Sequence, residues 1–157
     1  GRVARLVGIE NLFDMTVQAR NPRDGTMTCV GPGLRLEVPL DAHITGGANP
    51  GGPDPEDKGR EDRVSVGIRA SDIILAKQEL SGSSARNQLQ GQVVSVESRP
   101  PGYAVTLDCG QPLRCHITGA ALEEMEIRTG QRLWAVFKAS SCFLVDEVLE
   151  RPRNSEP

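Results

Sequence analysis

Apolar and polar residues alternate with a period of two through most of the C-terminal half of the chain. Residues 104–109 and 113–118 each carry this pattern, and Gly110-Gln111 lies between them. The pattern predicts two strands joined by a turn. An earlier alternating segment, residues 92–97, predicts a third strand, and Pro100-Pro101-Gly102 supplies its turn.

A short helix and two more strands are predicted after these three. Thr118 is a suitable N-cap for residues 120–125, which are mostly good helix formers. Alternation resumes at 133–138, and residues 142–145 form a last apolar run. The predicted order is β-β-β-α-β-β, which is typical of an OB-type barrel.

The N-terminal half predicts strands without a convincing helix. The candidate strands are residues 2–8, 15–19, 26–30, 34–38 and 64–69. In residues 34–38 the alternation implies one buried face and one wet face. A unit of about 60 to 75 residues buries only roughly 60% of its unfolded surface, so the two halves should pack together.

Two breaks in composition suggest how the chain is divided. Residues 46–62 are rich in Gly, Pro and acidic residues, and Ser81-Gly82-Ser83-Ser84 follows the last N-terminal strand. We expect an N-terminal OB-like half at 1–80 with an insertion at 46–62, a C-terminal module at 81–148 and a flexible tail at 149–157. The predicted fold class is all-β, with two OB-like β-barrel subdomains and one short helix in the C-terminal half.

Composition and charge exclude several functions. The 157 residues carry 18 Lys and Arg against 21 Asp and Glu, for a formal net charge of -3, so no global positive field attracts nucleic acid. No apolar run approaches the roughly 20 residues of a membrane span, and the first residues lack the zones of a signal peptide. The sequence therefore favours a cytosolic protein.

The sequence predicts neither a catalytic centre nor a metal site. His43 and His116 lie in different halves, and no GxxxxGK[ST] phosphate loop occurs. The cysteines lack CxxC spacing, and reduced structural thiols are favoured over a zinc site. They are Cys29, Cys109, Cys115 and Cys142.

Hydrogen-bond donors gather at both ends of the C-terminal module. The opening segment contains Ser84, Ala85, Arg86 and Asn87, and the segment after the fourth strand contains Lys138, Ala139 and Ser140. Hydroxyls, backbone amides and cationic heads would all donate to an anion. The alternative interpretation is that the serines are linker, Arg86 is a solvated charge and Lys138 only guards a strand edge.

These segments resemble the Mop or TOBE module of molybdenum-binding proteins. The resemblance rests on SARNQLQGQVVSV at 84–96 and VFKAS at 136–140. In addition, RVARLVGIEN at 2–11 and VGIRASDI at 66–73 resemble the segment that follows the nucleotide-binding domain in molybdate and tungstate ABC importer ATPases. Ala70-Ser71 departs from the Pro-Glu that is usual there, and the Walker motifs of the motor are absent from this sequence.

The resemblance implies a function and a set of partners. It implies a non-enzymatic regulatory domain that binds molybdate or tungstate at Ser84, Ala85, Arg86, Asn87, Lys138, Ala139 and Ser140, without another cofactor. It also implies a homodimer through the C-terminal halves, attached to an ABC motor and a permease at the cytoplasmic face of the membrane. The alternatives are a free-standing molybdenum-binding storage protein, and a ligand-free dimerisation module of an importer ATPase for another solute. A nucleic-acid-binding OB fold is disfavoured because few aromatic residues are present.

Overall fold

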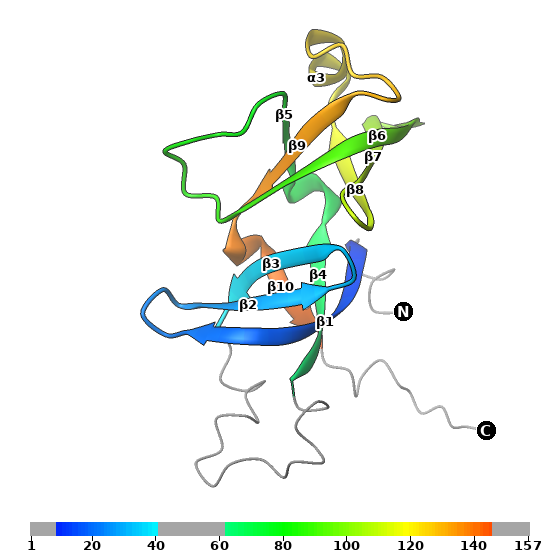
Figure 1. Cartoon of the computed structure of the whole chain (residues 1–157). Helices are drawn as coiled ribbons and strands as arrows, with labels where there is room; N and C mark the ends of the chain where they lie inside the picture. Colours follow the sequence, from blue (N-terminus) through cyan, green and yellow to red (C-terminus); the bar gives the residue numbers. More distant parts are fainter. Residues whose placement is uncertain (1–8, 41–61, 146–157) are drawn as a thin grey trace, which may run out of the picture.

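The computed structural model describes residues 9–40 and 62–145, which form two five-stranded antiparallel sheets (Figure 1). The strands of the first sheet lie in the order β10 (Cys142–Val145), β4 (Arg63–Arg69), β1 (Ile9–Asn21), β2 (Thr26–Gly31) and β3 (Leu34–Pro39). The strands of the second lie in the order β5 (Ile74–Ala76), β9 (Arg132–Phe137), β6 (Asn87–Arg99), β7 (Gly102–Asp108) and β8 (Pro112–Ile117). The helical elements are α3 (Gly119–Glu124) and two 3-10 turns, η4 (Ala70–Asp72) and η5 (Ala139–Ser141).

The all-β class and the single short helix of the C-terminal half are confirmed. Thr118 caps that helix, since its Oγ1 accepts a hydrogen bond of 3.1 Å from the backbone N–H of Ala121. Each predicted strand between residues 9 and 145 overlaps an observed one. The predicted strand at 2–8, the insertion from 46 to 61 and the tail at 149–157 lie outside the described residues.

The two sheets exchange their edge strands. β5 comes from the N-terminal half but pairs with β9 of the second sheet, through Ile74–Val136 and Leu75–Ala135. β10 is the last described strand, yet it pairs with β4 of the first sheet, through Cys142–Ile68 and its neighbours. Each sheet therefore contains one strand from beyond the predicted boundary at residue 80, and the division into two domains stays a prediction.

The two sheets repeat the same pattern of pairing. β1 lies between β4 and β2 and carries a bulge between Val17 and Ala19. β6 lies between β9 and β7 and carries a bulge between Val93 and Ser95. A 3-10 turn follows β4 and another follows β9, and each leads into an exchanged strand. The described chain thus consists of two equivalent units related by an approximate two-fold axis.

Two buried asparagines join these units in equivalent ways. Asn11 Nδ2 donates to the carbonyl oxygen of Arg114 at 2.9 Å, and its Oδ1 accepts from the Arg114 N–H at 2.8 Å. Asn87 forms the same pair of bonds with the backbone of Glu37, at 2.9 and 2.8 Å. Both asparagines are only 3% exposed. Each side chain therefore satisfies an N–H and a C=O that would otherwise be unpaired between the sheets.

The core is built mainly from aliphatic side chains of both sheets. Leu36, Val38, Leu107, Leu113 and Leu133 are essentially inaccessible to solvent. These residues lie on the apolar positions of the alternating segments, so period two correctly identified the buried faces.

Within residues 9–40 and 62–145, no helix has the length and apolar character that a membrane crossing requires.

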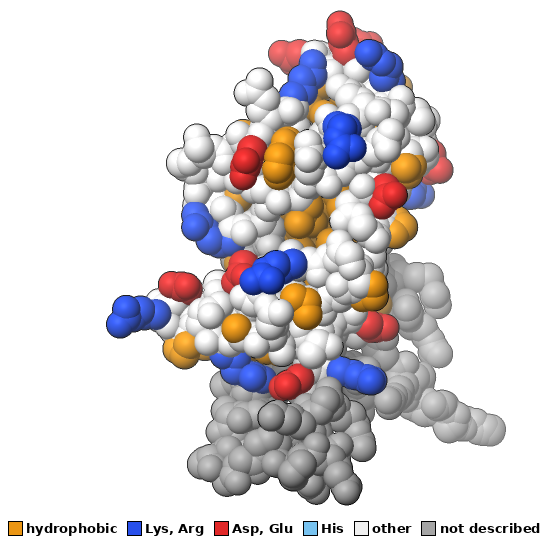
Figure 2. All heavy atoms as spheres, in the orientation of Figure 1, with side chains coloured by type: hydrophobic (Ala, Val, Ile, Leu, Met, Phe, Trp, Pro, Cys, Tyr) orange, Lys and Arg blue, Asp and Glu red, His pale blue; other side chains and the backbone are white. Residues whose placement is uncertain are grey.

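Figure 2 shows the surface of one face, on which basic and acidic side chains are mixed. Apolar side chains come to this surface mainly between the two sheets. No continuous basic patch is visible on this face.

Gly33 and Gly110 lie in the equivalent β2–β3 and β7–β8 turns and touch each other. Both have positive φ angles, 67° and 105°. A Cβ placed on Gly110 would collide with the Gly33 carbonyl oxygen, far inside van der Waals contact. Gln111 Nε2 also donates to the Pro32 carbonyl oxygen at 2.8 Å. Equivalent residues can meet in this way only close to the two-fold axis.

We predict that Gly110→Ala destabilises the fold by more than its backbone strain alone. Gly130→Ala is the matched control, because Gly130 has a positive φ of 93° but open space around its Cβ position. The control should cost about 1 kcal/mol, while Gly110→Ala should add about 1–3 kcal/mol for displacement of the facing turn. Urea unfolding measures both variants, and equal losses would contradict a tight contact between the turns.

Candidate functional site

The two predicted donor segments meet in one cavity of about 360 Å³ at the junction of the sheets. Of the seven predicted site residues, five line it: Ser84, Arg86, Lys138, Ala139 and Ser140. Ser84 and Arg86 precede β6, and the other three follow β9. β6 and β9 are neighbours whose pairing begins at Asn87–Phe137, so the ends of the module come together at the same edge of the second sheet.

Arg86 is exposed and its guanidinium folds back onto its own loop. Its NH2 donates to the Ser83 carbonyl oxygen at 2.8 Å, and its Nε lies 3.3 Å from the Ser84 carbonyl oxygen. Lys138 and Ser140 are also exposed, whereas Ala139 is buried. The cationic heads therefore lie at the rim, with the small Ala139 side chain at the wall.

The other two predicted residues, Ala85 and Asn87, do not line this cavity. The Ala85 N–H donates to Ser83 Oγ at 3.2 Å. The Asn87 side chain bonds the Glu37 backbone through both Oδ1 and Nδ2, and Nδ2 also donates to Cys142 Sγ at 3.9 Å. Asn87 thus holds the opening segment against β3, and its amide group is not free to donate to a ligand.

Sequence reasoning missed the wall contributed by the N-terminal unit. Asp24, Gly25 and Thr26 of the β1–β2 turn line the same cavity, together with Pro39 at the end of β3. The turn pattern Asn21 to Gly25 was readable in the sequence, but its proximity to residue 138 depends on packing between sheets. The Asp24 carboxylate opposes binding of an anion, so any anion here needs the cationic heads.

A second cavity of about 640 Å³ lies at the other end of the junction. Ser71, Tyr103, His116 and Thr118 line it, along with Arg99 and the β6–β7 turn. Pro100, Pro101 and Ile117 contribute apolar surface to its walls.

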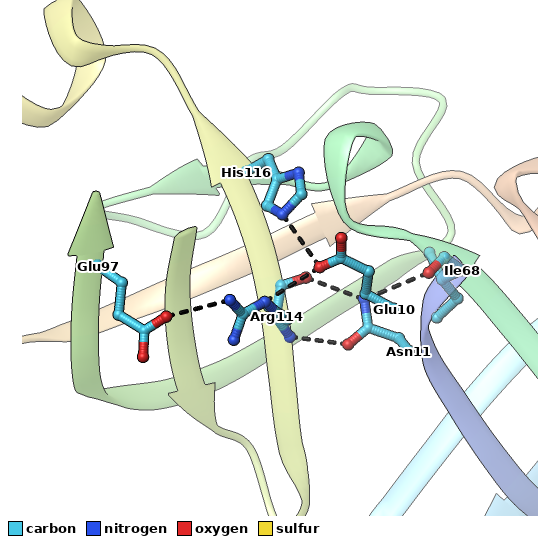
Figure 3. Close-up of polar contacts among 6 residues, drawn as sticks. All are labelled: Glu10, Asn11, Ile68, Glu97, Arg114 and His116. Atoms are coloured by element: carbon cyan, nitrogen blue, oxygen red, sulfur yellow. Dashed lines mark hydrogen bonds and ion pairs between the residues drawn. The ribbon is translucent and has the colours of Figure 1, made fainter. Parts of the chain in front are cut away.

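Charged side chains beside the second cavity form a connected cluster (Figure 3). Glu10 Oε1 lies 3.0 Å from Arg114 Nε, and Arg114 NH2 lies 3.2 Å from Glu97 Oε1. His116 Nε2 also lies 3.0 Å from Glu10 Oε1, without the alignment of a hydrogen bond. The cluster joins β1 to β8, so it too connects the two units.

The four cysteines are free, and burial raises the pKa of each thiol. For Cys29 and Cys109 the pKa rises to about 11, and for Cys142 it rises to about 12. Thiolates are therefore rare at neutral pH, which makes these side chains poor nucleophiles. Within the described residues, no three His, Cys, Asp or Glu residues lie close enough to hold a metal ion.

The chain is similar to several known proteins. Residues 83–144 match the model of the TOBE domain. The chain is 34% identical to the molybdate/tungstate import ATP-binding protein WtpC of Pyrococcus abyssi over 140 residues, and 31% identical to that of Pyrococcus horikoshii. These matches cover 88% of this chain but 33% of each relative, so the chain spans about a third of their length.

The chain is also similar to one short protein and to one solved structure. A probable molybdenum-pterin-binding protein of Haemophilus influenzae is 38% identical over 60 residues, which are 37% of this chain and 87% of that protein. A crystal structure of the cytoplasmic molybdate-binding protein ModG with molybdate bound has a TM-score of 0.66 and 24% identity. It covers 88% of this chain and 96% of that chain, and it confirms the fold.

We predict that Asn87→Ala costs stability, because it leaves the Glu37 N–H and C=O without their partners. The expected loss is about 1–3 kcal/mol of unfolding free energy. Gln90→Ala on the exposed side of β6 is the control and should change stability little. Asn11→Ala should behave like Asn87→Ala, since Asn11 bonds Arg114 in the same way. Urea unfolding in which Asn87→Ala matches Gln90→Ala would contradict this role.

Proposed function

The chain belongs to the TOBE-domain family and resembles the C-terminal region of molybdate/tungstate importer ATP-binding proteins, and on this premise we propose that it is the regulatory region of an ABC importer ATPase. It would bind molybdate or tungstate in the cytoplasm and feed back on transport. The relatives' names support the transporter context, while the ATPase motor would lie in the part of those relatives that this chain does not span.

The observation that carries this proposal is the cavity at the junction of the sheets. A tetrahedral dianion offers only acceptor oxygens, so its site must consist of donors. Ser84, Arg86, Lys138 and Ser140 bring two hydroxyls and two cations to one cavity. We assign oxyanion binding to these four residues, together with the backbone at Ala139.

Charge magnitudes explain why two cations are needed. One cation about 4 Å from a dianion gains roughly 8 kcal/mol gross at an effective dielectric constant near 20, and desolvation of both ions offsets most of it. The negative charge of Asp24 at the same cavity reduces the attraction for the dianion further. The second cation therefore decides whether a net attraction remains.

Regulation follows if the oxyanion binds one arrangement of the units better than another. A ligand with equal affinity for two arrangements shifts neither population. The proposed cavity has walls from both units, so a change in their relative placement alters the site. In the transporter, the bound anion would favour the arrangement in which the motor domains are inhibited.

A second candidate function is a free-standing molybdenum-binding protein for storage. The match to 87% of the small Haemophilus protein favours it, since that protein is little longer than the matched segment. Sequencing of the full-length gene product separates the two candidates, because Walker motifs upstream of residue 1 occur only in a transporter ATPase.

We predict that Arg86→Ala and Lys138→Ala each weaken oxyanion binding about ten- to a hundredfold, as expected for a lost bond to a charged group. Isothermal titration calorimetry with molybdate, tungstate and sulfate measures this. Arg128→Ala removes an exposed charge near α3 and is the control. Lys138→Arg should not restore binding, because a planar fork does not replace a compact ammonium. Unchanged affinity in both alanine variants would favour the ligand-free dimerisation module.

We also propose a homodimer through the second sheet, which contains most of the C-terminal half. Val94 in the β6 bulge is 50% exposed and Ile74 on the edge strand β5 is 59% exposed. These are the largest exposed fractions among the large apolar side chains of the described residues. A second copy would cover such apolar surface.

Sedimentation should accordingly find a dimer at micromolar concentration. Val94→Asp should shift the protein toward monomer, because it places a charge in the interface. Gln18→Asp is the matched control: Gln18 is exposed at the equivalent bulge of β1, on the first sheet. A wild-type monomer both with and without molybdate would rule the dimer out.

A further inference from the structure

The two cavities at the junction occupy equivalent places in the two units. The first lies between the β1–β2 turn, Pro39 at the end of β3, and Ser140 of η5. The second lies between the β6–β7 turn, His116 near the end of β8, and Ser71 of η4. The register confirms the match, because Thr26 pairs with Pro39 as Ala104 pairs with His116. The backbone elements around the first cavity are therefore related to those around the second by the approximate two-fold axis.

We propose that Glu10 restricts oxyanion binding to the first cavity, so that each chain offers one oxyanion site although its fold contains two equivalent cavities. This inference rests on the proposed function of the first cavity. Glu10 directly precedes Asn11, as Arg86 directly precedes Asn87, and these are the two buried asparagines that join the units. The position that supplies a guanidinium to the first cavity therefore supplies a carboxylate beside the second.

The charges around the second cavity are reversed at two equivalent positions. Glu37 and Arg114 are the residues whose backbones the two asparagines hold. Arg86 and Glu37 line a neighbouring hollow beside the first cavity. At the second cavity the same two positions hold Glu10 and Arg114, as an ion pair of 3.0 Å. Glu10 also lies 3.0 Å from His116, which lines the second cavity, so its negative charge acts there.

The second cation of the first cavity has no counterpart in the second. Lys138 directly precedes η5, and the equivalent residue before η4 is Arg69. The Arg69 guanidinium lies over the Phe143 ring, 4.9 Å from its centroid, and Arg69 does not line the cavity. Arg99 is the one Lys or Arg residue that lines it. One cation facing a nearby carboxylate is a poor site for a dianion.

A transplant of three residues tests this assignment. The triple variant Glu10→Arg, Arg114→Glu and Glu97→Asn copies Arg86, Glu37 and Asn21 to their equivalent positions. Glu10→Gln is the milder variant, which removes the repelling charge and leaves the other residues in place. Both are made in the wild type and in an Arg86→Ala/Lys138→Ala background, where only the second cavity remains. Thermal unfolding first verifies that each variant is folded.

Two readouts distinguish the cavities. Calorimetry with molybdate gives the amount bound per chain at saturation, and NMR follows the ring signals of Tyr103, the single tyrosine of the chain and a wall of the second cavity. In the wild type we expect binding without a Tyr103 response. In the variants we expect the amount bound to double, the Tyr103 signals to shift, and affinity in the double-alanine background to rise at least tenfold.

The outcomes separate this proposal from the function on which it rests. Wild-type binding that shifts Tyr103 and survives Arg86→Ala/Lys138→Ala overturns the role of Glu10 alone. The role of Glu10 is also overturned if the folded Glu10 variants bind no more molybdate than the proteins in which they were made. If the wild type binds no molybdate, tungstate or sulfate, the proposed oxyanion function falls and this inference falls with it.

Discussion

Neither five-stranded sheet of this protein is completed by its own half of the chain. β5 closes the edge of the second sheet and β10 closes the edge of the first, so each unit holds a strand of the other. Leu75 on β5 and Cys142 on β10 are buried at these edges. Separation of the units would uncover both residues and leave two strand edges unpaired, which is costly and prone to aggregation. The exchange therefore fixes the relative placement on which every other contact between the sheets depends.

That placement explains why the chemistry gathers at the junction. Each cavity combines the hairpin turn of one sheet with the 3-10 turn that follows a strand of the other, because η4 packs against β8 and η5 packs against β3. A ligand in either cavity would touch both units at once. Binding energy is thus coupled to the arrangement of the units and does not depend only on local side chains, which is the physical requirement for a regulatory site. Asn11 and Asn87 keep the backbone of each cavity in register whatever the side chains around it carry.

The sequence predicted the strands better than their partners. Alternation of period two reports which side chains are buried, so the segments around Val105, Leu113 and Leu133 were identified from their pattern. The same pattern carries no information on which strand lies alongside, and the crossing of β10 to the first sheet could not be seen. β5 is three residues long and too short to alternate measurably. The bonds between the Asn87 side chain and the Glu37 backbone could not be predicted for a similar reason, since Glu37 lies far away in the sequence. The donor segments at 84–86 and 138–140 were found because their chemistry is local.

The two equivalent cavities at the junction share their backbone contacts but differ in their charges. A fold with a two-fold axis needs equivalent backbone contacts, and the paired glycines and clamping asparagines supply them. It does not need equivalent charges, because a salt bridge bonds the same two positions in either order. Arg114 with Glu10 therefore holds the units together as Arg86 and Glu37 could, while the acidic and basic positions are exchanged beside the second cavity. Stability constrains these backbone contacts and leaves the sign of the charge at each position free, which is the physical basis for the proposal that only one of the two cavities binds an anion.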